Sequence, residues 1–313
     1  MKIAVLTSGG DAPGMNAAVR TVAVVGLEHG HKVYGVKGGY AGLLEGDFFE
    51  MERASVSGIS AFGGTILGSA RSSLFPTPEG QTQAKERIAE KGLDGLIVIG
   101  GNGSLTGAHL LAQDKPCKIM GIPASIDNDV GHCGLAIGVD TAVNTIVEAC
   151  DRISDTARAH RRAFIVEVMG RQCGFLAMRA GVAAEADAIL FGEAHEGEDD
   201  LVERLRVVLQ NTVGSRWYKQ RALIIKAEGV DVPTTRLVRR LQEHLDEDAP
   251  GVEIRETVLG HLVRGGRPSG LDRMIGQRLA FAALLAIEGG VHDMMAGWDA
   301  PGSPGMQTMD AHV

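Results

Sequence analysis

The 313-residue sequence has no excess of basic residues and no long apolar run. Its 31 Lys and Arg stand against 39 Asp and Glu, so the formal net charge is −8. This balance argues against a nucleic-acid surface, and any site for an anionic substrate must be a local cluster of basic side chains. No apolar run could cross a bilayer, and no signal-peptide segment follows Met1. We expect a cytoplasmic protein without nucleic-acid or membrane partners.

Cysteine is scarce as well. The four cysteines, Cys117, Cys133, Cys150 and Cys173, form no Cys-x-x-Cys pair and lie in or beside apolar runs. Zinc and redox motifs commonly contain such pairs, and disulfides belong to oxidising compartments. We therefore expect buried free thiols rather than disulfides or a cysteine zinc site.

Two common nucleotide-binding motifs are missing. The sequence contains no Walker A pattern, and no Gly-x-Gly-x-x-Gly follows its first apolar run, so neither a P-loop enzyme nor a Rossmann dehydrogenase is favoured. Glycine itself is abundant, with 43 residues and no collagen-like period. In an α/β protein this excess indicates tight loops where the backbone approaches a ligand closely.

The apolar pattern predicts strands that alternate with helices. The predicted strands are residues 2–7, 32–36, 96–99, 117–122, 163–169, 188–191, 223–227 and 253–259. The predicted helices lie near residues 15–27, 82–91, 104–111, 137–160, 174–184, 199–210, 233–245 and 272–288. This alternation indicates mostly parallel sheets with helices on both faces.

This number of strands is larger than we expect for a single α/β domain. We expect two doubly wound, mostly parallel α/β domains with the active site in the cleft between them. The first domain should comprise residues 1–138 and about 251–300, and the second residues 139–250. The divergent tail, residues 301–313, is rich in Gly, Pro and Met, and we expect it to be poorly packed.

The most informative stretch follows the apolar run 117–122. Pro123 ends that run, and two carboxylates come next, Asp127 and Asp129. Open α/β sheets bind ligands at the carboxyl ends of their strands. One acid there could accept a hydroxyl proton while the other holds a hard cation such as Mg²⁺. The alternative is a simple turn, which spacing alone favours because Asp and Asn bond their own backbone in turns.

Three glycine-rich loops favour a ligand site over a simple turn at Asp127 and Asp129. They are residues 9–14 (GGDAPG), 63–71 (GGTILGSAR) and 100–104 (GGNGS). Each offers backbone N–H groups, and two of them lead into helix N-termini, which favour phosphate. Glycine also simply makes turns, but three such loops beside two acids favour a nucleotide or polyphosphate site.

Basic residues near predicted strand ends indicate a second anion site. They are Arg162, Arg171, Arg255, His261, Arg264 and Arg267. Most surface arginines only favour solubility, but arginine beside glycine at a strand end suits bidentate phosphate recognition. A donor site plus a cationic pocket indicates phosphoryl transfer to a phosphorylated acceptor. Glu228 follows another strand and could accept hydrogen bonds from sugar hydroxyls, or be a loop or capping acid.

Six segments resemble, in family order, the signatures of 6-phosphofructokinases. They are residues 9–16, 63–71, 100–107, 123–129, 167–171 and 258–266, and the resemblance covers residues 1 to about 290. It implies an enzyme of glycolysis that uses ATP and Mg²⁺ to phosphorylate fructose 6-phosphate at its 1-hydroxyl. It also implies a homo-oligomer, a tetramer or possibly a dimer, whose active sites are shared between subunits.

The resemblance also implies roles for individual residues. Asp127 would take the proton from the sugar 1-hydroxyl, while Asp129 and Asn102 would occupy the metal positions. Arg71, Arg171 and Ser125 would assist catalysis. The nucleotide site would comprise Gly10, Tyr40, Arg71, Ser72, Gly101, Asn102, Gly103, Ser104 and Gly107. The sugar-phosphate site would comprise Ser125, Asp127, Asp129, Met169, Gly170, Arg171, Glu228, His261 and Arg264, joined by Arg162 and Arg255 of a neighbouring subunit.

A few positions depart from the family pattern or separate its branches. Asn102 stands where the family usually has an Asp linked to Mg²⁺ binding, so the cation site is weakened, and Ser125 replaces the usual Thr. Gly103 and Ala124 resemble the ATP-using branch, because pyrophosphate-using relatives tend to carry Asp and Lys there. Three alternatives stay open: a pyrophosphate-dependent enzyme, a kinase of another ketose phosphate such as sedoheptulose 7-phosphate, and a catalytically weak sugar-phosphate-binding regulatory protein.

Overall fold

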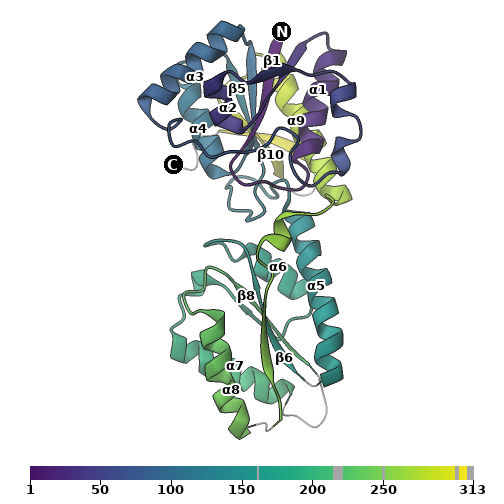
Figure 1. The fold of residues 1–313 in the computed structure, drawn as a ribbon, viewed down its shortest axis with the longest axis vertical. Coiled ribbons are helices and arrows are strands. Elements are labelled where there is room, and N and C mark those ends of the chain that lie inside the picture. Colours follow the sequence, from purple (N-terminus) through teal and green to yellow (C-terminus); the bar gives the residue numbers. More distant parts are fainter. Residues whose placement is uncertain (161, 214–220, 249–250, 300–302, 309–313) are drawn as a thin grey trace. The chain divides into compact units, whose positions relative to one another are not determined.

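The computed structural model describes residues 1–160, 162–213, 221–248, 251–299 and 303–308. The chain divides into two compact units. Unit 1 comprises Met1–Thr141 and Arg264–Val313, and unit 2 comprises Ala142–Val263. Figure 1 shows the elements of each unit, coloured along the sequence.

Unit 1 is built on a seven-stranded sheet in the order β11-β10-β5-β4-β1-β2-β3. Its strands are β1 (Lys2–Ser8), β2 (Lys32–Val36), β3 (Phe48–Glu50), β4 (Gly95–Gly100), β5 (Lys118–Pro123), β10 (Met294–Asp299) and β11 (Ser303–Thr308). Neighbouring strands are parallel except at the two edges, where β3 and β11 are antiparallel. The central strands β1 and β4 are almost wholly buried, which explains their continuous apolar sequences.

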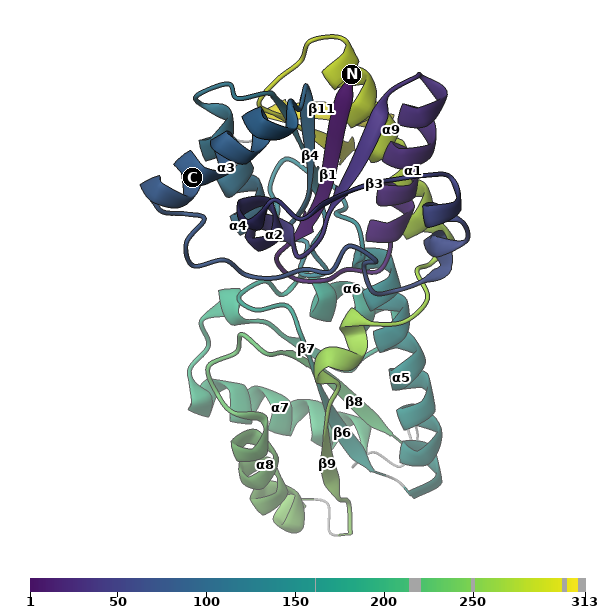
Figure 2. The ribbon, with the colours of Figure 1, turned by 45° about the horizontal axis from the view of Figure 1, so that its top comes forward.

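Helices cover both faces of this sheet. They are α1 (Met15–Glu28), α2 (Gly39–Glu45), α3 (Pro78–Lys91), α4 (Asn102–Ala112) and α9 (Gly270–Glu288), with short 3₁₀ turns η1 (Ala54–Val56) and η2 (Ile59–Ala61). Helices α1 and α9 pack against each other, while α3 packs against α2 and α4. Figure 2 shows these two groups on opposite sides of β1 and β4. The fully buried Leu6 and Val98 belong to the core on the α2–α4 side.

A buried carboxylate fastens the start of α9 within unit 1. Asp272 is fully buried and accepts hydrogen bonds from the backbone N–H of Gly138 at 2.8 Å and of Thr141 at 2.7 Å. The Thr141 hydroxyl donates to the same carboxylate and accepts from the backbone N–H of Ser269. This network joins segments more than a hundred residues apart in the sequence.

Unit 2 contains a four-stranded parallel sheet in the order β7-β8-β6-β9. Its strands are β6 (Ala163–Val168), β7 (Ala188–Leu190), β8 (Ala222–Ala227) and β9 (Ile254–Val258). Its helices are α5 (Val139–His160), which begins in the last residues of unit 1, α6 (Phe175–Ala183), α7 (Glu198–Thr212) and α8 (Thr234–Asp248), with 3₁₀ turns η3 (Gly192–Ala194) and η4 (Gly260–Arg264). Leucines spaced along α7 and α8, such as Leu205 and Leu241, are buried against β6 and β8.

The predicted α/β class, with mostly parallel sheets, is confirmed. The position where the chain returns to unit 1 differs from the expected one near residue 251. Strand β9 pairs with β6, in the register Ile165 to Glu256, so it belongs to unit 2 and the return comes at Arg264. Hydrophobic periodicity locates a strand but does not tell which sheet it joins.

Part of the tail also differs from the expectation. Ser303–Thr308 forms strand β11, which pairs antiparallel with β10 at the sheet edge. Its Gly and Pro content hid the strand signal, but an edge strand tolerates Pro because one side needs no ladder partner. Residues 301–302 and 309–313 lie outside the described residues.

Each helix in the described part of the chain falls short of the length or the apolar character that a membrane span requires. None of the four cysteines, all of which lie in the described part of the chain, forms a disulfide; Cys150 is buried and the other three are half-buried. Burial, with the nearby Asp94 carboxylate as a second cause, raises the pKa of Cys117 to about 12.

Candidate active site

Three neighbouring strands of unit 1 end at the same edge of its sheet. Ser8 at the end of β1 pairs with Gly100 at the end of β4, and Gly100 pairs with Pro123 at the end of β5. The glycine-rich loops after β1 and β4 and the acidic stretch after β5 therefore start side by side. We take this edge as the candidate active site of unit 1.

The N-terminus of α4 supplies the clearest anion-binding feature of this edge. Gly101 is its N-cap residue, and the first turn, Asn102 to Ser104, contains no acid. The first N–H groups of a helix have no partner within the helix, and the helix dipole favours an anion beside them. A Cβ on Gly103 would meet no heavy atom of the described residues within 4 Å, so this turn is open to a ligand.

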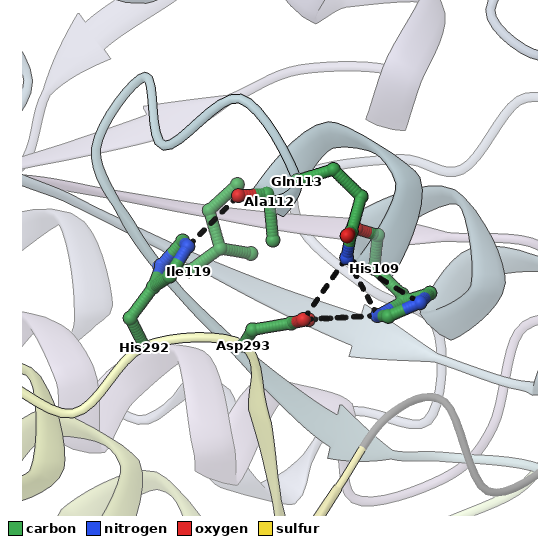
Figure 3. Close-up of polar contacts among 6 residues, drawn as sticks. All are labelled: His109, Ala112, Gln113, Ile119, His292 and Asp293. Carbon is green, nitrogen blue, oxygen red and sulfur yellow. Dashed lines mark hydrogen bonds and ion pairs between the residues drawn. The ribbon is translucent and has the colours of Figure 1, made fainter.

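The opposite end of α4 is tied to the start of β10 (Figure 3). His109 Nδ1 lies 3.0 Å from Asp293 Oδ1, and Gln113 donates to the same carboxylate at 3.2 Å. His292 Nδ1 accepts from the backbone N–H of Ile119 at 3.1 Å, and its Nε2 lies 2.8 Å from a carbonyl oxygen at the end of α4. These contacts fix the direction in which the helix N-terminus points.

Tyr40 of α2 lies beside the start of α4, to which two further predicted nucleotide-site residues, Ser104 and Gly107, belong. The ring of Tyr40 stacks on Phe75 with 3.6 Å between centroids, and its hydroxyl donates to the Ser104 carbonyl at 2.5 Å. A Cβ on Gly107 would lie 2.7 Å from the Phe75 ring, so only glycine leaves room for this stack. Tyr40 and Ser104 are each 5% exposed, and burial raises the pKa of Tyr40 well above its usual value. In this structure the three residues support the helix start.

The two acids after β5 differ in their environment. Asp127 is 3% exposed, whereas Asp129 is exposed. Ser125 Oγ donates to Asp129 Oδ1 at 2.9 Å, and the Asn102 amide donates to the Asp129 carbonyl at 3.2 Å. Asn128 takes a left-handed conformation with φ of 51°, which turns the chain between the acids. A buried carboxylate suits proton transfer and an exposed one suits a hydrated cation.

Arg264 brings a positive charge to Asp127. Its Nη2 lies 3.9 Å from Asp127 Oδ2, and its Nη1 lies 3.4 Å from the backbone oxygen of Asp11. A Cβ on Gly10 would lie 2.9 Å from this Nη1, so Gly10 leaves the space that the guanidinium occupies. The 3.9 Å separation is a charge contact rather than a hydrogen bond.

The loop 63–71 is held in place by Asn16 of α1 and by Gly9, the residue after β1. The fully buried Asn16 donates to the carbonyls of Phe62 at 3.1 Å and Gly64 at 2.6 Å, and accepts from Ile66 N–H at 2.9 Å. Ser69 Oγ donates to the Gly9 carbonyl at 2.6 Å, which joins two glycine-rich loops directly. No individual role for Asn16 was predicted, although it closes the first glycine-rich motif.

Asp11 is a second residue of that motif to which no role was assigned. Its carboxylate accepts from the Thr65 N–H at 3.2 Å. Burial raises its pKa, while hydrogen bonds from Thr65 and Ala12 and the charge of Arg264 act in the opposite direction. Beyond this loop, Arg71 is exposed, and Ser72 Oγ accepts from the Phe75 N–H at 3.0 Å.

In unit 2, Met169, Gly170 and Arg171 follow β6, and Glu228 follows the neighbouring strand β8. Glu228 Oε1 accepts from the backbone N–H groups of Gly170 at 3.1 Å and Arg171 at 2.6 Å. Gly170 has φ of 151°, and a Cβ there would lie 2.5 Å from the Cys173 carbonyl. Glu228 thus fixes the loop that carries the exposed Arg171.

A pocket of about 390 Å³ lies next to Glu228. Its wall includes Lys226, which is 1% exposed and whose Nζ lies 3.2 Å from Glu167 Oε2. The Thr234 hydroxyl donates to the same oxygen. Lys226 was not predicted as a site residue, although a lysine inside the apolar strand 223–227 is itself a signal, since a buried charge needs a partner.

The remaining predicted sugar-phosphate residues do not gather in one place. His261 lies in η4, past the carboxyl end of β9, and is exposed. Arg162 and Arg255 lie at the opposite edge of the sheet, where both contact Glu253 Oε2, at 2.9 and 2.8 Å. Hydrogen bonding to Arg255, then the charges of Arg255 and Arg162, lower the pKa of Glu253. Strand β6 separates Arg162 from Arg171 by roughly 20 Å.

These features define a class of protein. An open helix N-terminus among glycine-rich loops, two acids of different exposure and a neighbouring arginine fit phosphoryl transfer, which depends on positioning and charge neutralisation. The family model described as Phosphofructokinase matches residues 2–287. The chain belongs to the phosphofructokinase family and is a kinase.

Relatives and solved structures agree with this assignment. An "ATP-dependent 6-phosphofructokinase" of Thermotoga petrophila is 46% identical over 294 residues, which are 94% of this chain and 88% of that protein. One of Brevibacillus brevis is 47% identical over 298 residues, which are 95% of this chain and 89% of that protein. The phosphofructokinase structure from Saccharomyces cerevisiae matches with a TM-score of 0.90 and 34% identity, covering 98% of this chain and 44% of that one. A pyrophosphate-dependent phosphofructokinase from Marinobacter aquaeolei, with a TM-score of 0.86, 20% identity and coverage of 100% and 84%, shares the fold.

Proposed function

We propose that the chain is an ATP-dependent 6-phosphofructokinase that transfers the γ-phosphoryl group of ATP to the 1-hydroxyl of fructose 6-phosphate, a step of glycolysis. The observation that carries this proposal is the buried Asp127 beside Arg264, at the sheet edge where the N-terminus of α4 is open. The names of the bacterial relatives, which are 42–47% identical, support ATP as the donor.

Asp127 would act as the base that accepts the proton of the sugar hydroxyl, because its carboxylate is shielded from water and near a cation. Arg264 and the backbone N–H groups at the start of α4 would balance the charge that develops on the phosphoryl oxygens. Arg71, Arg171 and Ser125 are the further predicted contacts of the reacting groups.

Mg²⁺ would neutralise part of the phosphate charge when it is bound with ATP. The Asp129 carboxylate, the Ser125 hydroxyl and the Asn102 amide oxygen are hard oxygen ligands of the kind that Mg²⁺ prefers. With a single carboxylate, this set fits a cation that keeps several waters and takes its other ligands from the nucleotide.

We assign the phosphoryl donor to unit 1 and the sugar phosphate to unit 2. Met169, Gly170, Arg171, Glu228 and His261 would bind the sugar phosphate at the carboxyl edge of the unit 2 sheet. Because Arg162 and Arg255 lie at the other edge, we infer that they serve a site of a second copy. The working enzyme would then be a homo-oligomer, a tetramer or a dimer.

Two positions favour ATP over pyrophosphate. A Cβ on Gly103 would meet no heavy atom of the described residues within 4 Å, so glycine leaves this turn open, and an Asp there would add a negative charge at the start of α4. Position 124 is an alanine that is 1% exposed, whereas pyrophosphate-using relatives tend to carry a lysine there.

The test is product formation by the purified protein with Mg²⁺, comparing ATP with pyrophosphate and fructose 6-phosphate with sedoheptulose 7-phosphate. We expect fructose 1,6-bisphosphate with ATP, and its loss in Asp127→Asn would exclude a contaminating kinase. Product only with pyrophosphate would overturn the donor assignment. Binding of sugar phosphate without turnover by any donor would favour the regulatory-protein alternative.

A further inference from the structure

Three metal-ligating side chains meet in unit 1, away from the candidate active site. His29 and His31 flank Gly30 between α1 and β2, and Glu288 is the last residue of α9. Glu288 Oε1 lies 2.7 Å from His29 Nδ1 and 2.7 Å from His31 Nε2. One ligand atom from each residue lies within 4.8 Å of the other two. We propose that His29, His31 and Glu288 form a binding site for a divalent transition-metal cation of the Zn²⁺ class.

The ligand chemistry favours this class of cation. Two imidazole nitrogens and one carboxylate are common Zn²⁺ ligands, and a set of three leaves a fourth position for water. Mg²⁺ prefers oxygen ligands, so this cluster is chemically different from the cation position expected at Asp129. A tetrahedral cation about 2.0–2.1 Å from each nitrogen holds its ligand atoms about 3.3 Å apart. Glu288 Oε1 lies 2.7 Å from each imidazole nitrogen, so side-chain rotations would lengthen both of these contacts as the cation enters.

The backbone holds both histidines in place. The Gly30 N–H donates to Leu27 at 3.1 Å, and the His31 N–H donates to Gly26 at 2.8 Å, which is the pattern of a Schellman turn at the end of α1. Gly30 has φ of 76°, the left-handed conformation that this turn requires. The turn therefore fixes the spacing of the two imidazoles, and little backbone ordering is left to oppose metal binding.

Packing and exposure complete the site. Helix α1 packs against α9, so Glu288 reaches a turn 257 residues earlier in the sequence. The side chains of His31 and Glu288 are 11% and 23% exposed, whereas that of His29 is 38% exposed. Two ligands are thus held by the protein, and the third can move to admit a cation from solvent.

A bound cation would join the end of α1 to the end of α9. The 14 residues of α1 put this cluster roughly 20 Å from the glycine-rich loop at the other end of the helix. We therefore expect metal to stabilise the fold rather than to take part in phosphoryl transfer. An imidazole N–H of His29 and one of His31 donate to Glu288 Oε1, and a cation would replace those two protons.

The test is calorimetric titration of the chelator-treated full-length protein with Zn²⁺, beside thermal unfolding with and without Zn²⁺. We expect one Zn²⁺ per chain and, near saturation, a rise of about 5 °C in the unfolding midpoint. His31→Ala and Glu288→Gln should each weaken binding at least tenfold. His195→Asn alters an exposed histidine outside the cluster, with φ of 49°, and should bind like the wild type.

Each contrary result overturns the proposal, which does not depend on the proposed function. Absence of Zn²⁺ binding by the wild type would mean that the cluster is only a hydrogen-bonded contact. Glutamine is nearly isosteric with glutamate, so Glu288→Gln remains informative even if His31→Ala fails to fold. Equal Zn²⁺ binding by the wild type and Glu288→Gln would place the metal elsewhere. Co²⁺ provides an independent readout, because a thiolate charge-transfer band would show that cysteines bind the metal instead.

Discussion

The two units arrange their predicted site residues differently. In unit 1, β1, β4 and β5 end together, and their loops bring Gly10, Asn102, Asp127 and Asp129 to one edge of the sheet. In unit 2, Arg171 and Glu228 lie at the carboxyl edge, while Arg162 and Arg255 pair with Glu253 at the opposite edge. Unit 1 therefore has its candidate site within one chain, whereas the predicted set of unit 2 does not meet within one chain.

This difference shows which residues a parallel sheet can bring together in one chain. Loops after adjacent parallel strands converge, so a site at the carboxyl edge forms from one chain. Residues at the start of a strand or just before it lie at the other edge, about a strand length away. A cationic pair there serves another molecule or only stabilises the fold, and the predictions below separate these possibilities.

The largest effect is expected at the one-chain site of unit 1. Asp127→Asn removes the proposed base with little change in size, and kcat should fall about 10³-fold. The measurement is steady-state kinetics with ATP and fructose 6-phosphate. Asp47→Asn alters an exposed carboxylate of the same unit and should keep normal turnover. Near-normal kcat in Asp127→Asn would remove Asp127 from the mechanism.

The next effect concerns the opposite edge of unit 2. The double variant Arg162→Ala/Arg255→Ala removes two cations that we assign to a neighbouring sugar-phosphate site. Loss of a hydrogen bond to a charged group costs about 1.5–3 kcal/mol, so KM for fructose 6-phosphate should rise about 10–100-fold. KM for ATP should change little, because the donor is assigned to unit 1.

Glu253→Gln provides the matched control for that pair. It removes the carboxylate that both arginines contact but keeps the two cations. If the pair only stabilises the fold, both changes should lower stability and leave KM unchanged. A KM that rises in the double variant and not in Glu253→Gln supports substrate binding.

A smaller effect is expected for the support of the loop 63–71. Asn16→Ala leaves backbone groups of Phe62, Gly64 and Ile66 without their side-chain partner, and should lower the free energy of unfolding by about 2 kcal/mol. Urea unfolding measures this change. Asn211→Ala, at an exposed position of α7, should alter stability by less than about 0.5 kcal/mol. Equal effects would mean that Asn16 does not hold the loop.

The smallest effect is expected at the cation position. Asn102→Asp adds a carboxylate beside Asp129 and should lower the Mg²⁺ concentration for half-maximal rate a few-fold, because an added charge strengthens a hard-cation site. The same change removes the hydrogen bond to the Asp129 carbonyl, which limits the gain. A titration of initial rate against Mg²⁺ measures it, and a higher Mg²⁺ requirement in the variant would contradict the assignment.

Much of the fold could be predicted from the sequence, because buried parallel strands are continuous apolar runs. Strands β1, β4 and β5 all show this signal, and glycine-rich turns follow β1 and β4. The short edge strands β3 and β11 do not, since three residues or a Pro- and Gly-containing segment carry little periodicity. The sheet that β9 joins depends on tertiary pairing, which no local pattern contains.

The sequence also predicted which segments meet at the candidate site of unit 1, but not the contacts that each side chain makes there. The burial that separates Asp127 from Asp129 arises only when β5 is packed in its sheet. The stack of Tyr40 on Phe75 and the contacts of Asn16 join positions far apart in the chain. His29 and His31 are close in sequence, but Glu288 contacts them only because α1 and α9 pack together.

The central claim is that a site with its base in one subunit uses Arg162 and Arg255 of another. The direct test mixes the Asp127→Asn and Arg162→Ala/Arg255→Ala variants, dissociates them and lets them reassemble. If sites are shared, random hybrids contain about one intact site in four, and activity at low fructose 6-phosphate should rise to about a quarter of wild type. If activity stays at the average of the two separate variants, the arginines act within their own chain and the claim is contradicted.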